Sequence, residues 1–516
     1  MTDCLQNSSL DWALKSIIHC GDTDIFPIPF EIESIKNYWP EIREDLVSKD
    51  LSDYRTSASR SILMPKTDGT FRIVKQLDPL DSLVYNSLLY EMAGDVESHR
   101  VHSDLKVACA YRINIQDTGK VFDEENAWSN YHLKSSELAE SGKYTHVLVA
   151  DIADFYNQIY HHRVENVLES ATGNEVRSKS IEKFLGSLTQ KQSRGVPVGP
   201  IPSIVLAEAC LDDVDKKLMS LGIQHTRYVD DFRIFCCSKK QALFVMQELI
   251  SYLYTAHRLS LQSHKTYICE VNEFIRKELK DPREEEEKKK VKSINDLLCD
   301  ALSAFGYVFT EEDLDSVTKS RITIDNLHEL MQRCLCERPL RLGFARYLLR
   351  RATYLRTRKI YDLLLNNLVY LTPVFRDVCL YFAKTLPTPA PANFSEKLLC
   401  FLEKSDYGEL PYVRMWALEL FSKSPKLIPF EKALSLSNES KDSLGIRPAA
   451  ILAKSYNQID WVRSYKENWN CHGPWDRRSI IWAGSILSPD EKKAWLRPIT
   501  EGSDLLDKCV AIKALS

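Results

Sequence analysis

The pattern of hydrophobic and polar residues changes about halfway along the chain. In the first half, two short apolar runs flank the turn Lys66–Gly69 and predict a β-hairpin over residues 60–76. A helical pattern follows from Leu80 to Met92. The apolar run at residues 147–150 is typical of a buried central strand. We therefore expect the first half to be a mixed α+β domain.

Beyond residue 290 the strand signals fade and helical periodicity takes over. Residues 342–354, 359–369 and 413–421 carry apolar side chains three and four positions apart, and short turns with Pro or Ser separate them. This pattern is typical of stacked helical hairpins, so we expect an all-α, HEAT-like repeat domain, although no clean repeat period is visible. The basic and aromatic stretch Arg350–Arg356 could bind nucleic acid, but an ordinary basic helix surface explains it more simply.

A run of charges at residues 281–292 separates these two halves. Four glutamates are followed by three lysines, and Glu–Lys pairs of this spacing suit a solvated helix or a flexible connector. The run marks the expected domain boundary. The expected parts are an N-terminal helical extension (1–54), a mixed α+β domain (55–280), a charged linker (281–295) and an all-α domain (296–516).

Composition narrows the class of protein. A chain of 516 residues is too long for one compact core, and its 44% hydrophobic and 27% charged residues are typical of soluble globular domains. The net charge of −4 argues against a uniformly basic nucleic-acid coat, but it allows a local basic channel. No signal peptide or long apolar span is visible. The 14 cysteines form no CxxC pair, which favours reduced thiols in a cytosol over a zinc site.

Two adjacent carboxylates, Asp230 and Asp231, lie between two short apolar strands in the segment His225–Phe235. Like charges this close resist ionising together, and a chain that places them at a hairpin tip usually has divalent metal ions to neutralise them. A third carboxylate, Asp151, directly follows the apolar run 147–150, far enough upstream for a crossover that contains helices. Alone, Asp151 could merely cap the next helix. Together the three predict a metal site.

This arrangement of carboxylates is the one that nucleic-acid polymerases need. Two Mg²⁺ ions about 4 Å apart, with Mn²⁺ as a possible substitute, would be held between Asp151 and Asp230, and Asp231 would support the pair. One ion would activate a primer 3′-hydroxyl, and the other would neutralise the charge that develops on the leaving pyrophosphate. We expect Asp154 to cap or pair locally.

Three motifs in this region resemble motifs A, B and C of reverse transcriptases in order and spacing. They are Asp151 with Phe155 and Tyr156, then Gly195–Pro200, then Tyr228–Asp231. Leu259–Thr266 looks like motif D. The resemblance covers residues 55–275 and implies the fingers and palm of a right-hand polymerase, with an α+β fold.

The resemblance also implies a role for further residues. Tyr156 stands where the family places its steric gate, which favours deoxynucleotides. Lys66 and Arg72 on the finger hairpin would hold the triphosphate, although they would otherwise be solvated hairpin charges. Lys265 would protonate the pyrophosphate. The expected catalytic residues are Asp151, Asp230, Asp231 and Lys265; the nucleotide-binding residues are Lys66, Arg72, Ile152, Tyr156 and Gly199; and the metal ligands are Asp151, Ile152, Asp230 and Asp231.

Motif B departs from the family at one position. Reverse transcriptases commonly carry glutamine after the proline of this motif, whereas Val198 follows Pro197 here and cannot hydrogen-bond through its side chain. Template reading could therefore be relaxed. Some defence-type relatives are associated with untemplated or protein-primed synthesis, and the sequence does not select which Tyr or Ser hydroxyl would prime.

Several stretches narrow the resemblance to prokaryotic defence-associated reverse transcriptases of the abortive-infection and unknown-group types. They are Ala110–Arg112, Pro200–Ser203 leading into Glu208, and the long helical C-terminal region. In that group a helical, often HEAT-like, domain replaces the thumb. The resemblance implies a cytoplasmic antiphage DNA polymerase, RNA-directed or untemplated. Its expected partners are deoxynucleoside triphosphates, an RNA template or associated non-coding RNA, and the DNA product, with no membrane; a homo-oligomer is left open.

Two other functions stay open at this point. One is an RNA-dependent RNA polymerase, because such enzymes share the palm, although Tyr156 disfavours it. The other is a catalytically silent helical scaffold that binds RNA or protein. The clustered carboxylates argue against the scaffold, because a cluster of like charges without a function lowers the stability of the fold.

Overall fold

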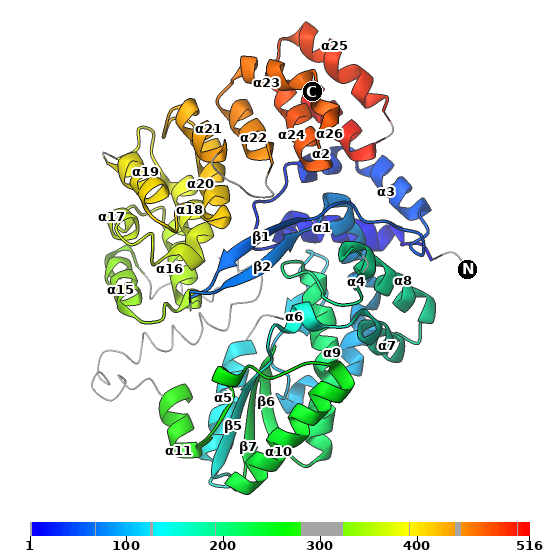
Figure 1. The fold of residues 1–516 in the computed structure, drawn as a ribbon, viewed down its shortest axis with the longest axis vertical. Helices are drawn as coiled ribbons and strands as arrows, with labels where there is room; N and C mark the ends of the chain where they lie inside the picture. Colours follow the sequence, from blue (N-terminus) through cyan, green and yellow to red (C-terminus); the bar gives the residue numbers. More distant parts are fainter. Residues whose placement is uncertain are drawn as a thin grey trace. The chain divides into compact units, whose positions relative to one another are not determined.

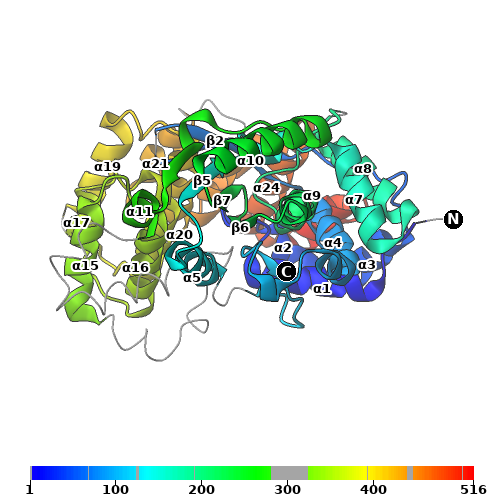
Figure 2. The ribbon, with the colours of Figure 1, turned by 90° about the horizontal axis from the view of Figure 1, so that it is seen from below.

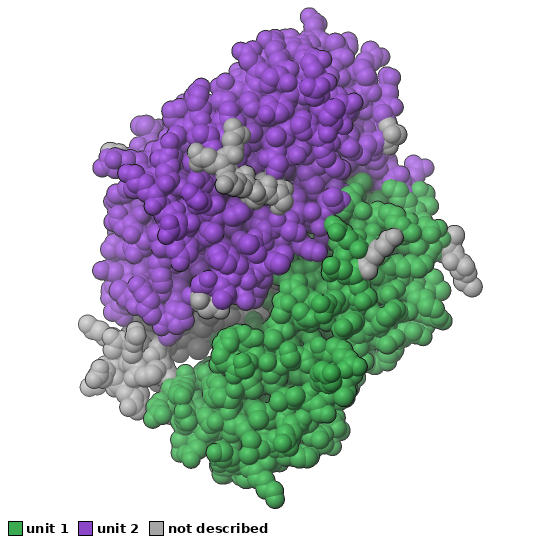
Figure 3. Space-filling view, viewed as in Figure 1, with its two compact units in different colours: residues 1–23, 46–57, 80–309 green, residues 24–45, 58–79, 310–516 purple. Residues whose placement is uncertain are grey.

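The computed structural model of the protein describes residues 3–67, 69–123, 127–190, 192–279, 323–391, 393–438, 445–502 and 504–516 (Figure 1). The charged run 281–292 and the expected linker 281–295 lie outside these residues. The chain forms two compact units, each from three stretches of sequence (Figure 3). Unit 1 holds residues 1–23, 46–57 and 80–309, and unit 2 holds residues 24–45, 58–79 and 310–516.

The centre of unit 1 is a four-stranded antiparallel sheet with the strand order β6-β7-β5-β8. Its strands are β5 (His146–Asp151), β6 (Gln224–Tyr228), β7 (Asp231–Cys236) and β8 (Tyr267–Glu270). β5 lies between β7 and β8, and Val147, Leu148 and Ala150 are fully buried. The prediction of a buried central strand at residues 147–150 is confirmed.

Helices cover both faces of this sheet (Figure 2). On one face, Val147 and Phe235 pack with Leu138 of α5 (Ala127–Glu140) and Phe274 of α11 (Val271–Phe274). On the other face lies α10 (Lys239–Tyr252), which contacts β5 and β7. The remaining elements, mainly in unit 1, are α1 (Asn7–Cys20), α4 (Pro79–His99), β3 (Arg112–Ile113), β4 (Phe122–Asp123), α6 (Phe155–Gln158), α7 (His161–Thr172), α8 (Glu175–Leu188) and α9 (Ile201–Ser220).

Unit 2 combines a β-hairpin with many helices. The hairpin consists of β1 (Arg60–Pro65) and β2 (Phe71–Gln76), close to the predicted bounds. The described C-terminal residues are helical, as expected, and α16, α18, α20, α22, α24 and α26 each pack on the next member of this row (Figure 1). The helices are α2 (Glu31–Asn37), α3 (Trp39–Ser48), α15 (Ile324–Cys336), α16 (Leu342–Tyr354), α17 (Tyr361–Leu365), α18 (Phe375–Thr385), α19 (Phe394–Lys404), α20 (Pro411–Lys423), α21 (Phe430–Asn438), α22 (Arg447–Ser455), α23 (Ile459–Lys466), α24 (Pro474–Ala483), α25 (Pro489–Thr500) and α26 (Leu505–Leu515).

The hairpin packs into unit 2 through one of its faces. Ile62 and Val74 are opposite each other in the register and both are buried, and β1 contacts α20. The side chains of Leu63 and Ile73, which are also opposite each other, are exposed. Because strand side chains alternate between faces, the hairpin has one face in the core of unit 2 and one face open.

A buried ionic network joins the three stretches that form unit 2. Glu31 accepts hydrogen bonds from both Nη atoms of Arg447, each at 2.7 Å, and from Nε of Arg478 at 3.2 Å. Arg478 also lies 2.8 Å from Asp78, directly after the hairpin. Burial opposes ionisation of Glu31, but the charge of Arg447 lowers its pKa below the ordinary value. The network therefore stays charged and ties the N-terminal segment and the hairpin to the C-terminal helices.

The compact units divide the chain differently from the expected boundaries at residues 54, 280 and 295. Residues 24–45 and the hairpin belong with the C-terminal helices and not with the α+β domain. The physical reason is the ionic network, in which Glu31 pairs with Arg447 across 416 positions of sequence. Local periodicity carries no information about a pairing at this separation.

Among the described helices, none is long and apolar enough to cross a bilayer. The cysteines within the described residues are free thiols.

We predict that Glu31→Gln strongly destabilises unit 2. Removing one partner of a buried ion pair typically lowers the free energy of unfolding by about 3 kcal/mol or more, because charged partners are left without their countercharge. Glu329→Gln is the matched control, since Glu329 pairs with Arg333 at an exposed helix surface and should change little. Chemical denaturation measures both. Equal stabilities of the two variants would contradict the role of the network.

Candidate active site

The end of β5 and the start of β7 bring two of the predicted carboxylates together. Asp151 is the last residue of β5 and Asp231 is the first of β7, and the two are directly opposite each other in the antiparallel register. Asp151 is buried, whereas Asp231 is exposed at the start of β7, an inner strand of the sheet. Opposed side chains in a ladder lie about 5 Å apart at Cβ. A hydrated cation can therefore reach the pair from the Asp231 side.

The turn that carries Asp230 has an unusual backbone. Val229 and Asp230 connect β6 to β7, and Val229 has a φ of +57°. A β-branched residue rarely adopts positive φ, at a cost of about 1–3 kcal/mol. The N–H of Ile152 donates to the carbonyl of Asp230 at 3.2 Å, and the N–H of Gln262 donates to the carbonyl of Asp151 at 2.7 Å. These bonds fix the turn against the end of β5.

The electrostatics of this site favour a bound cation. Desolvation by the surrounding protein, the charge of Asp230 and the proximity of Asp151 together raise the pKa of Asp231 to about 8. Lys265 supplies a countercharge, with its Nζ 2.8 Å from Oδ2 of Asp151. Partial burial opposes the charge of Lys265, but its hydrogen bond to Asp151 raises the pKa of the ammonium group. Ionisation of Asp231 therefore places a negative charge beside two other carboxyl groups, and a bound cation would relieve that repulsion.

The donor set suits a hard divalent ion. Carboxylate oxygens are the ligands that Mg²⁺ prefers, and none of the predicted ligands is a soft donor. The carboxylate oxygens of Asp151, Asp230 and Asp231 do not all lie within 4.8 Å of one another. Mutual repulsion without a bound cation explains this separation. A metal ion would have to draw at least one of these side chains inward.

A second group of potential ligands lies on α7 and α8. His162, Glu165 and Glu182 have ligand atoms within 4.8 Å of one another, and His162 is exposed. Nδ1 of His162 is 3.2 Å from Glu165 and 3.4 Å from Glu182. Contacts between the exposed imidazole of His162 and the two glutamates account for this group as a surface polar cluster, without a metal.

The segments that carry motifs A and B lie side by side. The N–H of Val196 donates to the carbonyl of Tyr156 at 2.9 Å, and the N–H of Gly195 donates to the carbonyl of Ile159 at 2.8 Å. Gly195 has a φ of +94°, and a Cβ there would lie 3.4 Å from a carbonyl oxygen of α6, so glycine suits this contact. These bonds hold the motif B segment against the segment that carries Tyr156.

Asp154 is occupied locally. Its carboxylate accepts hydrogen bonds from the side-chain amides of Asn157 at 2.7 Å and Gln158 at 3.1 Å. This local pairing separates its role from that of Asp151, although both lie in the same short segment.

The structure brings together some of the predicted site residues and not others. Asp151, Ile152, Asp230, Asp231 and Lys265 meet at one edge of the sheet of unit 1. Gly199, in unit 1, has a φ of +131°. Lys66 and Arg72 lie exposed on the hairpin of unit 2, so their assignment to the nucleotide stays a prediction.

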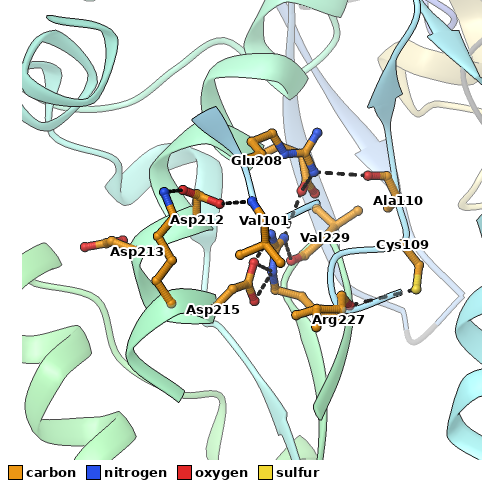
Figure 4. A network of polar contacts seen from close by, with 12 residues as sticks. Val101, Cys109, Ala110, Glu208, Asp212, Asp213, Asp215, Arg227 and Val229 are labelled. Carbon is orange, nitrogen blue, oxygen red and sulfur yellow. Dashed lines mark hydrogen bonds and ion pairs between the residues drawn. The ribbon is translucent and has the colours of Figure 1, made fainter. Parts of the chain in front are cut away.

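A buried polar network that was not predicted from the sequence lies directly behind the turn (Figure 4). Arg227 and Asp215 are both fully buried, and Nη1 of Arg227 donates to the carbonyl of Val229 at 2.9 Å. The signal in the sequence was an arginine in the strand directly before the Val229–Asp230 turn, together with acidic residues on the apolar side of the helix at residues 201–220. Such residues are rarely buried unless they are paired.

Comparisons with known proteins agree with this geometry. Residues 64–295 match the family model described as reverse transcriptase (RNA-dependent DNA polymerase). The Retron Ec48 reverse transcriptase of Escherichia coli is 25% identical over 209 residues, which are 40% of this chain. The aligned part spans 47% of that relative, about half of its length. The match over residues 64–295 confirms the predicted class of enzyme domain, an RNA-directed DNA polymerase type of nucleotidyltransferase.

Some solved structures are also similar over long stretches. A telomerase from Candida albicans, bound to a fragment of telomeric RNA, is 11% identical, covers 80% of this chain and 71% of its own, and has a TM-score of 0.30. An apo telomerase from Candida tropicalis is 11% identical, covers 79% and 73%, and has a TM-score of 0.32. Scores this low do not establish a shared fold.

We predict that Asp231→Asn raises the thermal stability of the metal-free protein. At pH 9, above the pKa of about 8, Asp231 is ionised in the wild type, so the substitution removes one of three neighbouring negative charges. About 1 kcal/mol of relief corresponds to a rise in Tm of about 2–4 °C for a unit of this size. Added Mg²⁺ should raise the Tm of the wild type more than that of the variant. Differential scanning calorimetry with EDTA or Mg²⁺ measures this, with Asp154→Asn as the control. A lower Tm for Asp231→Asn in EDTA would contradict the repulsion.

Proposed function

We propose that this chain is a metal-dependent DNA polymerase of reverse-transcriptase type that adds deoxynucleotides by two-metal phosphoryl transfer. The observation that carries the proposal is the pairing of Asp151 with Asp231 across neighbouring strands, with Asp230 in the turn beside them. An arrangement of acidic residues at strand ends, held by a tightly bonded turn, suits a site that must collect two cations. The match of residues 64–295 to the reverse transcriptase family supports the same reaction.

The proposed roles of the carboxylates follow from their positions. Asp151, Asp230 and Asp231, with the backbone of Ile152, would hold two Mg²⁺ ions, for which Mn²⁺ could substitute. When bound, these ions lower the pKa of a primer 3′-hydroxyl and neutralise charge on the leaving pyrophosphate. Asp151 would orient its partners from a rigid, central strand. Asp231, exposed at the start of β7, would face the incoming nucleotide.

The other predicted residues would act on the nucleotide. Lys265 keeps its proton readily, because its hydrogen bond to Asp151 raises its pKa, so it would carry the proton that the pyrophosphate receives. Tyr156 would exclude a ribose 2′-hydroxyl, and Gly199 would let backbone approach the nucleotide. Lys66 and Arg72 would bind the triphosphate from the hairpin.

The proposed biological role is antiphage defence in a prokaryotic cytoplasm. It rests on the resemblance to defence-associated reverse transcriptases and on similarity to a retron reverse transcriptase. In this proposal the row of helices from α16 to α26 is a HEAT-like domain that replaces a thumb, and the template is an RNA or an associated non-coding RNA. Val198, buried in motif B, is consistent with relaxed template use or untemplated synthesis.

DNA synthesis by the purified protein tests the proposal directly. With Mg²⁺ and labelled deoxynucleotides, we expect incorporation on an RNA template or on co-purified RNA. Asp230→Asn/Asp231→Asn should lower it by more than about 100-fold, since even residues behind metal ligands are worth about 10–100-fold. Asp154→Asn, which alters a locally paired carboxylate, is the matched control and should remain active. Absence of synthesis with every template and primer, including co-purified RNA, would refute the proposal.

We predict that Tyr156→Ala weakens the selection of deoxynucleotides over ribonucleotides by about 100-fold, because the ring no longer meets the 2′-hydroxyl. Tyr156→Phe keeps the ring and should keep the selection. The ratio of kcat/KM for the two substrates measures this. An unchanged ratio in Tyr156→Ala would remove Tyr156 from this role, and a wild type that prefers ribonucleotides would favour the RNA-polymerase alternative.

A further inference from the structure

A fully buried arginine lies directly behind the turn that carries Asp230. Arg227 is in β6, on the face opposite to that of Asp231, and its side chain has no exposed surface. Figure 4 shows Arg227 beside Glu208 and Asp215 of α9 and beside the carbonyl of Val229. A buried guanidinium is stable only when its donors are met by acceptors. Its partners therefore show what it holds.

Arg227 has three sets of partners. Its Nε and Nη2 donate to the carboxylate of Asp215, at 3.0 Å and 2.6 Å. Its Nη1 lies 2.9 Å from Oε2 of Glu208 and donates to the carbonyl of Val229, also at 2.9 Å. The guanidinium thus spans from a rigid helix to the backbone of the turn. The planar fork of arginine suits such simultaneous contacts, and an ammonium group does not.

The carbonyl that Arg227 holds belongs to the strained residue. Val229 has a φ of +57°, and such a conformation persists only where the surroundings over-determine it. The hydrogen bond from Arg227 fixes the peptide between Val229 and Asp230 on one side of the turn. The hydrogen bond from the N–H of Ile152 to the carbonyl of Asp230 fixes the next peptide. Asp230 therefore lies between two clamped peptide groups.

Further contacts hold Arg227 and its partners in place. Oε2 of Glu208 also accepts from Arg100 at 2.7 Å, and Arg100 donates to the carbonyl of Tyr111 at 2.9 Å. Asp215 is also 3.1 Å from His225. The N–H of Arg227 donates to the carbonyl of Val107 at 2.7 Å. Neither end of the guanidinium can move without breaking several buried bonds.

The charges of this cluster balance. Arg100 and Arg227 face Glu208 and Asp215, with His225 beside Asp215. Burial opposes the ionised form of Asp215, but Arg227 and His225 lower its pKa to about 2. Burying such pairs seldom adds net stability compared with apolar packing, so a geometric role explains their presence better.

We propose that Arg227 is a positioning residue that holds the Val229–Asp230 turn in the conformation that metal binding requires. The proposal rests on the proposed function, because it assigns the metal ions to Asp151, Asp230 and Asp231. Arg227 touches neither metal nor substrate. It acts through the carbonyl of Val229, anchored by Glu208 and Asp215.

Binding of Mn²⁺ to the full-length protein, followed by electron paramagnetic resonance, tests this without relying on catalysis. We expect Arg227→Gln to weaken Mn²⁺ binding by about 10–100-fold, as loss of a group that orients metal ligands does. Arg227→Lys, which keeps the charge but loses the fork, should restore binding only in part. In polymerisation assays the Mg²⁺ concentration for half-maximal rate should rise and kcat should fall, while KM for the nucleotide changes less.

Arg177→Gln is the matched control for general destabilisation. Arg177 is also buried in unit 1, where its guanidinium pairs with Asp3 and Glu91 and donates to the carbonyl of Cys4. It should lower Tm to a similar extent and leave the affinity for Mn²⁺ unchanged. If Arg177→Gln weakens Mn²⁺ binding as much as Arg227→Gln does, the effect is global destabilisation and the proposal fails.

The outcomes separate the two proposals. Unchanged Mn²⁺ affinity in folded Arg227→Gln would overturn the positioning role and leave the polymerase proposal standing. Weakened affinity together with a wild type that never synthesises DNA would support the positioning role and overturn the polymerase proposal. Mn²⁺ binding that is the same in the wild type and in Asp230→Asn/Asp231→Asn would overturn both.

Discussion

Repulsion between carboxylates at the ends of two neighbouring strands is the constraint on which the rest of unit 1 depends. The register of β5 and β7 sets Asp151 opposite Asp231, and the turn adds Asp230, so the chain collects negative charge where the sheet ends. Desolvation, followed by the charge of Asp230 and the proximity of Asp151, raises the pKa of Asp231 to about 8. Lys265 relieves part of the repulsion through Asp151. Repulsion between these carboxylates favours the binding of cations at this site.

Buried hydrogen bonds and ion pairs in the surrounding fold hold the backbone in place against that repulsion, although their residues do not contact metal or substrate. Behind the turn, Arg227 joins Asp215 and Glu208 to the carbonyl of Val229. Unit 2 uses the same device, since Glu31 links Arg447 and Arg478 in its core. In both units, charged side chains from distant stretches of sequence meet inside the protein and fix the path of the backbone. Because apolar packing would often be as stable as such pairs, we infer that they are kept here to fix geometry.

Local sequence patterns predicted the elements well and their assembly less well. The hairpin near residues 60–76, the strand at residues 147–150 and the helix at residues 342–354 were readable, because two-residue and 3.6-residue periods are local properties. The three carboxylates were readable because adjacent acids at a strand end repel each other and are seldom kept without a cation to neutralise them. The membership of the hairpin in unit 2 and the Arg227 network were not, since each depends on which distant residues meet. Periodicity shows which face of a helix or strand is buried, but it does not show which distant residues that face contacts.

Anomalous diffraction from crystals grown with Mn²⁺ tests the central claim most directly. We expect two peaks, about 4 Å apart, within coordination distance of Asp151, Asp230 and Asp231. We also expect Lys265 to leave Asp151 when the ions bind. A structure with no ion between the ends of β5 and β7, or with ions only at His162, Glu165 and Glu182, would contradict this claim.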